Sequence, residues 1–113
     1  MSLPVRKAEY FIADFDERFR WYDEEASWET AERFLAAVDV TLEKLAKLPE
    51  LGRIRHFSHP RLAGLRSFRV EPPFTSLLIF YRITSEALEA FRLMHGARDL
   101  PRRLLEPPNP AED

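Results

Sequence analysis

The segment LMHGARDLPRRLL, from Leu93 to Leu105, contains residue types that could perform acid–base chemistry or bind an anion. The ordinary pKa of histidine lies near neutral pH, which makes His95 the candidate for moving a proton. Arg98 offers a planar guanidinium suited to a carboxylate or a phosphate, and Asp99 would complete a His-Arg-Asp set. The segment has two interpretations: a catalytic cluster, or a strand that ends in a capped terminus.

The partners that would complete a catalytic or metal-binding motif are missing from the sequence. There is no cysteine, which excludes disulfides, thiolate zinc sites and cysteine nucleophiles. No G-x-S-x-G motif occurs, and the three glycines of the chain form no phosphate-binding loop. His56 and His59 lie three positions apart with no acidic third ligand nearby in the sequence. We therefore expect neither a metal nor a cofactor.

Arginines on the expected strands form a second group of candidate residues. Arg66 and Arg69 lie on one predicted strand, and Arg82 lies on the next. Because side chains alternate along a strand, Arg66 and Arg69 should point to opposite faces and cannot share one pocket. Arg82 shares its face with Leu78 and Phe80, which predicts an aliphatic stem packed beneath a charged head. The alternative is that individual arginines pair with acids of the predicted helices.

Charge is unevenly distributed along the chain. Residues 1–51 carry 7 basic and 12 acidic side chains (−5), and residues 52–105 carry 10 basic and 4 acidic ones (+6). Residues 106–113 add 3 acidic side chains, so the three parts sum to the net charge of −2. This net charge argues against a strongly electrostatic nucleic-acid binder. The arginine-only basic half indicates an acidic partner, and the alternative is a solvated face in a protein from a GC-rich genome.

Two helices are predicted in the first half of the chain. One apolar face with helical spacing is formed by Phe11, Phe15, Phe19 and Tyr22. Ser27 is the expected N-cap of a second helix over residues 28–48, which Pro49 ends. The short connection between the two helices predicts an antiparallel helical hairpin.

The second half of the chain has the alternation of strands after a loop without a clear period over residues 53–64. Strands are expected over residues 4–9, 65–71, 76–84 and 87–95. Short connections predict that the last three pair as an antiparallel meander. The chain is therefore expected to be an α+β domain of order β-α-α-β-β-β, with the helical hairpin packed on a small, mainly antiparallel sheet. The hairpin covers one face of the sheet, and the cover of the other face is left open.

The end of the last strand is expected to lead into a short helical turn. Gly96 would supply a positive φ or a bulge, and Asp99 would cap a turn that runs to Leu105. Arg98 and Arg102 would then share a face and form an exposed basic lip at the end of the sheet.

The length of 113 residues predicts a single domain, which we assign to residues 1–105. The acidic, proline-rich tail EPPNPAED follows over residues 106–113. The longest apolar run, residues 77–81, is too short to span a bilayer, and the N-terminus lacks the apolar stretch of a signal peptide. We expect a cytoplasmic protein that does not associate with a membrane.

Five segments of the chain, in this order, resemble the toxins of type II toxin–antitoxin modules, the ParE/RelE superfamily. They are DFDERFRWYDEEA, AERFLAAVDVTLEKLAKLPELGR, GLRSFRV, LLIFYRI and LMHGARDLPRRL. The resemblance covers residues 5–105, and the combination of the segments in this order is specific. It implies a RelE/ParE-like fold and a cognate antitoxin whose C-terminal segment wraps the toxin. Both a dimer and a hetero-oligomer with the antitoxin are compatible with it.

Two toxic activities occur in this superfamily. RelE-like members cut mRNA on the ribosome with a basic patch, which here implies Arg66, Arg69, His95 and Arg98. ParE-like members are thought to inhibit DNA gyrase without cutting RNA. The chain departs from the RelE-like pattern, because an apolar residue, Leu77, falls near the position of one RelE-like arginine. The position of the C-terminal tyrosine likewise falls near a leucine, and no tyrosine follows residue 81.

We therefore prefer a ParE-like toxin that inhibits DNA gyrase by binding and is not an enzyme, with the ribosome a less favoured partner. The alternatives are a ribosome-dependent mRNA endonuclease and a non-toxic antitoxin-binding module. The residues expected to bind the target or the antitoxin are Arg66, Arg69, Arg82, Arg98, Asp99 and Arg102.

Overall fold

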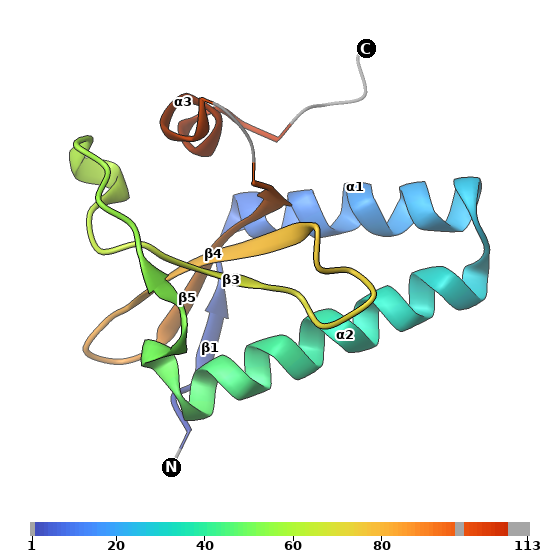
Figure 1. Cartoon of the computed structure of the whole chain (residues 1–113), viewed down its shortest axis with the longest axis horizontal. Coiled ribbons are helices and arrows are strands. Elements are labelled where there is room, and N and C mark those ends of the chain that lie inside the picture. Colours follow the sequence, from blue (N-terminus) through green and yellow to red (C-terminus); the bar gives the residue numbers. More distant parts are fainter. Residues whose placement is uncertain (1, 97–98, 109–113) are drawn as a thin grey trace.

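A helical hairpin packs on one face of a five-stranded sheet in the computed structural model of the chain, which describes residues 2–96 and 99–108 (Figure 1). The helices are α1 (Glu9–Glu25), α2 (Trp28–Lys47) and α3 (Leu100–Leu105), and two 3₁₀ turns are η1 (Pro49–Leu51) and η2 (Pro60–Leu62). The strands are β1 (Val5–Lys7), β2 (Arg53–Ile54), β3 (Arg66–Arg69), β4 (Leu77–Ile83) and β5 (Leu88–His95).

The sheet has the order β1-β5-β4-β3-β2. Only the pairing of β1 with β5 is parallel among the described strands, and the other three pairings are antiparallel. The predicted α+β class, with a hairpin on a mainly antiparallel sheet, is confirmed. None of the described helices has both the length and the apolar character needed to cross a bilayer.

The hairpin forms as the sequence predicts, because its apolar face packs on the sheet and the residues that begin and end α2 are those expected. The Ser27 hydroxyl accepts a hydrogen bond from the Thr30 N–H at 3.0 Å and caps α2. Pro49 follows the end of α2 and begins η1. The main core lies between the hairpin and the sheet, and its larger members include Phe11, Phe34, Leu42, Leu45, Leu77, Ile79, Tyr81 and Leu88.

The opposite face of the sheet is covered by the chain itself. Leu62 and Leu65 from the segment before β3, with Leu100 and Leu104 from α3, pack in a second core against Phe80 and Met94 of the sheet. The loop predicted over residues 53–64 contains two short elements that the sequence did not indicate, β2 and η2. Both residues of β2 are exposed, so no apolar alternation marks this strand in the sequence.

An irregularity in β5 changes which way its second half faces. Phe80 pairs with Arg92 and Tyr81 pairs with Ala90, so Phe91 is an extra residue in β5. After this bulge, Arg92 lies on the face of Phe80 and the second core, while Leu93 belongs to the main core. The bulge therefore keeps the Arg92 side chain out of the main core and on the side of the sheet where α3 packs.

Candidate functional site

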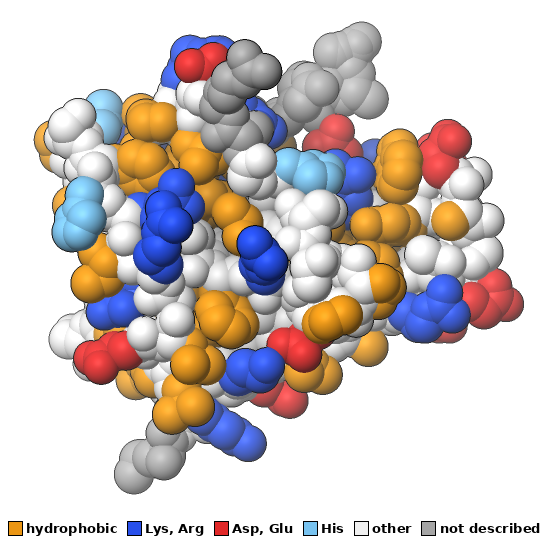
Figure 2. All heavy atoms as spheres, viewed as in Figure 1, with side chains coloured by type: hydrophobic (Ala, Val, Ile, Leu, Met, Phe, Trp, Pro, Cys, Tyr) orange, Lys and Arg blue, Asp and Glu red, His pale blue; other side chains and the backbone are white. Residues whose placement is uncertain are grey.

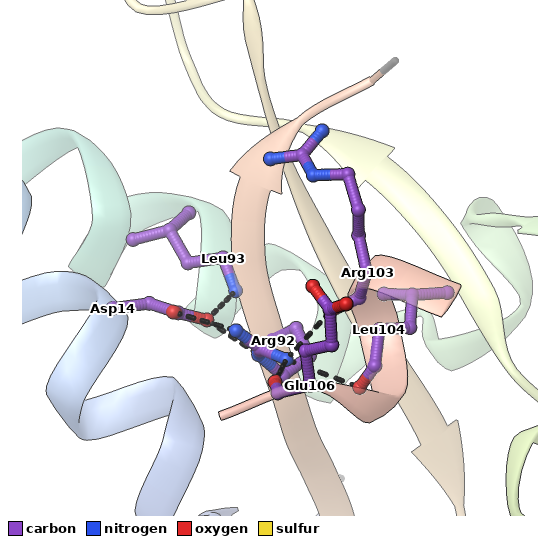
Figure 3. Close-up of polar contacts among 6 residues, drawn as sticks. All are labelled: Asp14, Arg92, Leu93, Arg103, Leu104 and Glu106. Atoms are coloured by element: carbon purple, nitrogen blue, oxygen red, sulfur yellow. Dashed lines mark hydrogen bonds and ion pairs between the residues drawn. The ribbon is translucent and has the colours of Figure 1, made fainter. Parts of the chain in front are cut away.

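The most enclosed ion pair among the described residues joins Asp14 of α1 to Arg92 of β5 (Figure 3). The Arg92 Nε–H donates to Asp14 Oδ2 at 2.8 Å, and the Nη2–H donates to Oδ1 at 3.0 Å. The two side chains are 3% and 7% exposed. This bidentate geometry holds both charges rigidly. The alternative that strand arginines pair with acids of the helices thus holds for Arg92, although the sequence does not indicate Asp14 as its partner.

The remaining donor of Arg92 is directed at the C-terminal end of α3. Its Nη1–H groups donate to the carbonyl oxygens of Arg103 at 3.1 Å, Leu104 at 3.1 Å and Glu106 at 2.7 Å. The last carbonyls of a helix have no partner within the helix and carry the negative end of its dipole. Arg92 therefore fastens α3 to the sheet and to α1.

Asp14 also accepts a hydrogen bond from the backbone of β5, at a point beyond the end of β1. The last residue of β1, Lys7, pairs with Ala90. Further along β5, the Leu93 N–H donates to Asp14 Oδ2 at 2.9 Å. The carboxylate thus takes the place of a strand neighbour at a backbone donor that would otherwise be buried without a partner. The contacts of Asp14 and Arg92 support the fold and leave neither side chain free for chemistry.

A cavity of about 260 Å³ lies beside this pair, and His95 is among its lining residues. Burial lowers the pKa of His95 from its ordinary value of 6.5, and the nearby charges of Arg18 and Arg103 lower it further. Both effects favour the neutral form of the imidazole. Within the described part of the chain, its ring makes no hydrogen bond to a carboxylate that would orient it as a general base.

Two expectations for the turn after β5 were wrong. Among the described residues of this turn, Asp99 has a positive φ, at 58°, and Gly96 does not. Asp99 occupies the N-cap position of α3, but its side chain makes no capping hydrogen bond there because its backbone is left-handed. A Cβ at Gly96 would lie 2.9 Å from Leu78 Cδ1, the flexible end of that side chain, which can shift to make room. Arg98 lies outside the described residues.

Arg66 and Arg82 both form hydrogen bonds within the protein. The Arg66 guanidinium donates to the carbonyl oxygens of Glu50 at 3.3 Å and Gly52 at 2.9 Å. Arg82 donates to Glu89 at 3.4 Å and to the carbonyl of Arg61 at 2.6 Å. Its guanidinium also lies 5.0 Å from the ring centre of Phe91, and its side chain is 25% exposed. The guanidinium of Arg82 itself packs on Phe91, and its Nε is buried without a hydrogen-bond partner among the described residues, so the head is more enclosed than the sequence predicts.

Arg102 is the more exposed of the two arginines in α3. It bonds Glu106 at 2.6 Å and lies 3.7 Å from Asp99, with 63% of its side chain exposed. Such exposed pairs contribute little to stability. Arg102 and Asp99 are accessible to a partner, as the interpretation of this end as a binding surface requires.

Arg66 and Arg69 lie on opposite faces of β3, as predicted. Arg66 pairs with Tyr81, which belongs to the main core, while Arg69 pairs with Leu78, which packs against the second core. His95 pairs with Leu77 of the main-core face, so it also lies on the face opposite Arg69. The three residues of the expected RNA-cleaving patch that the structure describes therefore do not converge.

Arg69 instead lines a groove of about 580 Å³ together with Arg53 and Arg55, which sequence reasoning did not select. Burial lowers the pKa of Arg55, and the charge of Arg53 adds to this effect. The Arg55 Nη1–H donates to Ser67 Oγ at 3.0 Å. The sequence signal that could have found this group is R-I-R, because two arginines two positions apart in an extended segment lie on the same side.

No group of three metal-ligating side chains occurs in the described residues, 2–96 and 99–108. His59 Nδ1 accepts a hydrogen bond from the Arg61 N–H at 3.1 Å and caps η2. This contact gives His59 a local structural role.

Comparisons with known proteins agree with this architecture. Residues 5–100 match the family model described as "ParE toxin of type II toxin-antitoxin system, parDE". A solved structure described as "Chromosomal ParDE TA system from P. aeruginosa" is similar in fold, with a TM-score of 0.67 and 16% sequence identity. The similarity covers 85% of this chain and 98% of that one. A search of curated proteins finds no match.

Proposed function

The chain belongs to the ParE toxin family of type II toxin–antitoxin systems, and from this premise we propose that it inhibits DNA gyrase by binding and is neutralised by a cognate antitoxin. Binding would use the exposed basic side chains of the sheet and of its C-terminal end. These include Arg69 and Arg102, whose guanidinium groups are accessible. Arg66 and Arg82 would contribute through the backbone segments that they hold in place.

The observation that supports binding over RNA cleavage is the separation of the candidate catalytic side chains. Cleavage at a ribose 2′-OH needs an acid and a base placed on either side of one phosphate. Arg66 is directed at backbone carbonyls, Arg69 lies on the opposite face of β3, and His95 lies on the face away from Arg69. A surface of this kind can hold a partner, but it does not bring these groups to one scissile bond.

Two parallel assays test this proposal on the purified chain. In the first, supercoiling by DNA gyrase is followed as the chain is added, with and without its antitoxin. In the second, mRNA is followed in a translating extract. We expect supercoiling to fall, the antitoxin to restore it, and the mRNA to stay intact. Codon-dependent cleavage of the mRNA with normal supercoiling would contradict the proposal, and so would the absence of both effects.

A further inference from the structure

The cavity of about 260 Å³ beside the Asp14–Arg92 pair lies between α1, the end of β5 and α3. Two of its lining residues, Arg18 of α1 and Arg103 of α3, are half-buried and form no ion pair within the described part of the chain. The guanidinium carbon of Arg18 lies 5.1 Å from the centre of the Trp21 ring. Stacking of this kind uses the face of the guanidinium and leaves its N–H edges free for a ligand.

His95, at the end of β5, lines the same cavity. The charges of Arg18 and Arg103 both lower the pKa of its imidazole, so the two guanidinium groups lie close to this ring. Figure 3 shows the Arg103 side chain extending from α3 toward the end of β5, away from the buried ion pair. Figure 2 shows a histidine side chain beside a Lys or Arg side chain where the end of β5 meets α1. Nitrogen-bearing side chains from three elements therefore surround one space.

The backbone of His95 adds a further donor on this side. The Leu93 N–H is turned away from β4, since it donates to the Asp14 carboxylate. In an antiparallel ladder this outward direction recurs at every second residue, so the His95 N–H also points to the edge of β5. The partner strand β1 ends opposite Ala90 and does not reach this part of the edge. A backbone N–H beside two guanidinium groups is a favourable arrangement for an oxyanion.

The carboxylates that line the cavity do not cancel these donors. Asp14 is bound to Arg92, and Glu106 bonds the guanidinium of Arg102, which is not a lining residue, at 2.6 Å. Glu17 is the lining carboxylate that has no ion pair among the residues that the structure describes. The unpaired charges are therefore two guanidinium groups against one carboxylate, and this excess favours an anionic ligand.

The volume of the cavity and the directions of its donors select the class of anion. About 260 Å³ is below the roughly 300–1,000 Å³ of pockets for drug-sized ligands, but it far exceeds the space of one water molecule. Arginine binds both carboxylate and phosphate. The oxygens of a carboxylate lie in one plane, whereas donors here approach from α1, β5 and α3. A tetrahedral phosphate offers oxygens in all three directions.

We propose that the cavity between α1, the end of β5 and α3 binds a small phosphate-bearing ligand through Arg18, His95 and Arg103. The ligand is inorganic phosphate or the phosphate monoester of a small molecule, and the phosphoryl group is the chemistry that both share. A bound phosphate joins α1 to α3 beside the buried ion pair. The inference goes beyond the proposed function, because the site involves neither gyrase nor an antitoxin.

The test follows the His95 ring signals by NMR while inorganic phosphate is added to the full chain. Chloride keeps the ionic strength constant, because salt screens exposed charges. Ribose 5-phosphate is the ester probe, and acetate is the carboxylate probe. The test variant is Arg18→Gln/Arg103→Gln, which removes both guanidinium groups from the cavity. The control variant, Arg20→Gln/Arg33→Gln, removes the same charge from exposed positions on α1 and α2.

We expect phosphate to shift the His95 signals and to leave those of His56, which does not line the cavity, unchanged. The pKa of His95 should rise by about 1, because an anion beside the imidazole favours its cation. The test variant should bind phosphate about tenfold more weakly than the natural chain, while the control variant retains the natural affinity. Glu17→Gln removes a repelling carboxylate and should bind phosphate more tightly, which tests the site even where the double variant fails to fold.

The two phosphate probes distinguish the sources of the ligand. Tighter binding of ribose 5-phosphate supports an ester as the ligand, and tighter binding of inorganic phosphate supports the free ion. The inference is overturned if neither probe shifts the His95 signals, if acetate shifts them equally, or if both double variants lose affinity equally. Unchanged or weaker binding by Glu17→Gln would also overturn it. None of these readouts involves gyrase, so their failure is separate from failure of the proposed function.

Discussion

The Asp14 carboxylate and the Arg92 guanidinium lie 78 positions apart in the sequence and form two hydrogen bonds in the interior of the protein. Through this pair, α1, β5 and α3 are held as one unit, because Arg92 also binds three carbonyls at the end of α3. The C-terminal segment that resembles the ParE/RelE toxins is thus positioned by a residue near the start of α1.

Arg92→Met should destabilise the protein by about 3–5 kcal/mol, because it leaves the Asp14 carboxylate buried without its partner. The double variant Asp14→Asn/Arg92→Met removes both charges while keeping an acceptor for the Leu93 N–H, and it should lose less than the single variant. Urea unfolding followed by circular dichroism measures both. As a control, Arg102→Ala breaks an exposed pair and should cost about 0–1 kcal/mol. Equal losses for Arg92→Met and Arg102→Ala would contradict the structural role of the buried pair.

Leu104→Ala tests whether α3 is part of the folded core. Leu104 is fully buried in the second core, so its truncation should cost about 2–5 kcal/mol. The adjacent Leu105 is only partly buried, and Leu105→Ala should cost clearly less. Urea midpoints give the comparison. If the two variants unfold at the same urea concentration, α3 does not dock on the sheet as described.

Gly52→Ala should destabilise the junction between η1 and β2. A Cβ at this position would lie 2.6 Å from Tyr81 Cε1. The ring cannot move aside, because the Tyr81 hydroxyl donates to the Pro49 carbonyl at 2.6 Å and accepts from the Gly52 N–H at 2.9 Å. We expect a loss of about 1–3 kcal/mol in thermal or urea unfolding. Gly96→Ala is the matched control, since the tip of Leu78 can shift there, and a loss as large as that of Gly52→Ala would contradict this explanation.

The pH dependence of stability should contain a contribution from His95. Its pKa in the folded protein is lowered from 6.5 by burial and by Arg18 and Arg103. The unfolded chain therefore binds the proton more readily, so this contribution is present above about pH 6.5 and is lost as the pH falls toward the folded pKa. His95→Gln should flatten the fall in the urea midpoint between about pH 7.5 and about pH 5.5.

An NMR titration of the His95 ring separates the causes of this shift. Arg18→Gln removes one of the repelling charges and should raise the pKa of His95 toward its ordinary value. Arg20→Gln removes an exposed arginine from the same helix and is the control. A pKa of His95 at or above 6.5 in the natural chain would contradict the burial and repulsion seen in the structure.

Most of the fold is predictable from the sequence because local signals and tertiary packing agree there. The apolar face of α1 and the Ser27 cap mark the hairpin, and short strand-like segments, with the continuous apolar run LLIFY in β4, mark β3 to β5. The missed elements have no such local signal: β2 is two exposed residues long, and its existence depends on pairing with Arg66 and Ser67. The bulge at Phe91 likewise depends on packing of both sheet faces, and no glycine in the sequence indicates its position.

The candidate site is less predictable than the fold, since it depends on which arginines form hydrogen bonds or ion pairs in the folded chain. Sequence alternation places Arg66 and Arg69 on opposite faces, but it cannot show that Arg66 binds backbone carbonyls. The pairing of Asp14 with Arg92 depends on how α1 crosses β5 and has no trace in sequence spacing. Arg53 and Arg55, which line the groove, lie in a segment for which the sequence predicts a loop, so their shared side has no strand signal.

The most direct test of the proposed toxic activity is a gyrase supercoiling assay in which the purified chain is titrated against a fixed amount of enzyme. We predict that supercoiling is lost as the chain approaches and exceeds the gyrase concentration, and that an equimolar amount of the antitoxin restores it. Full supercoiling at a large excess of folded chain would contradict gyrase inhibition by binding.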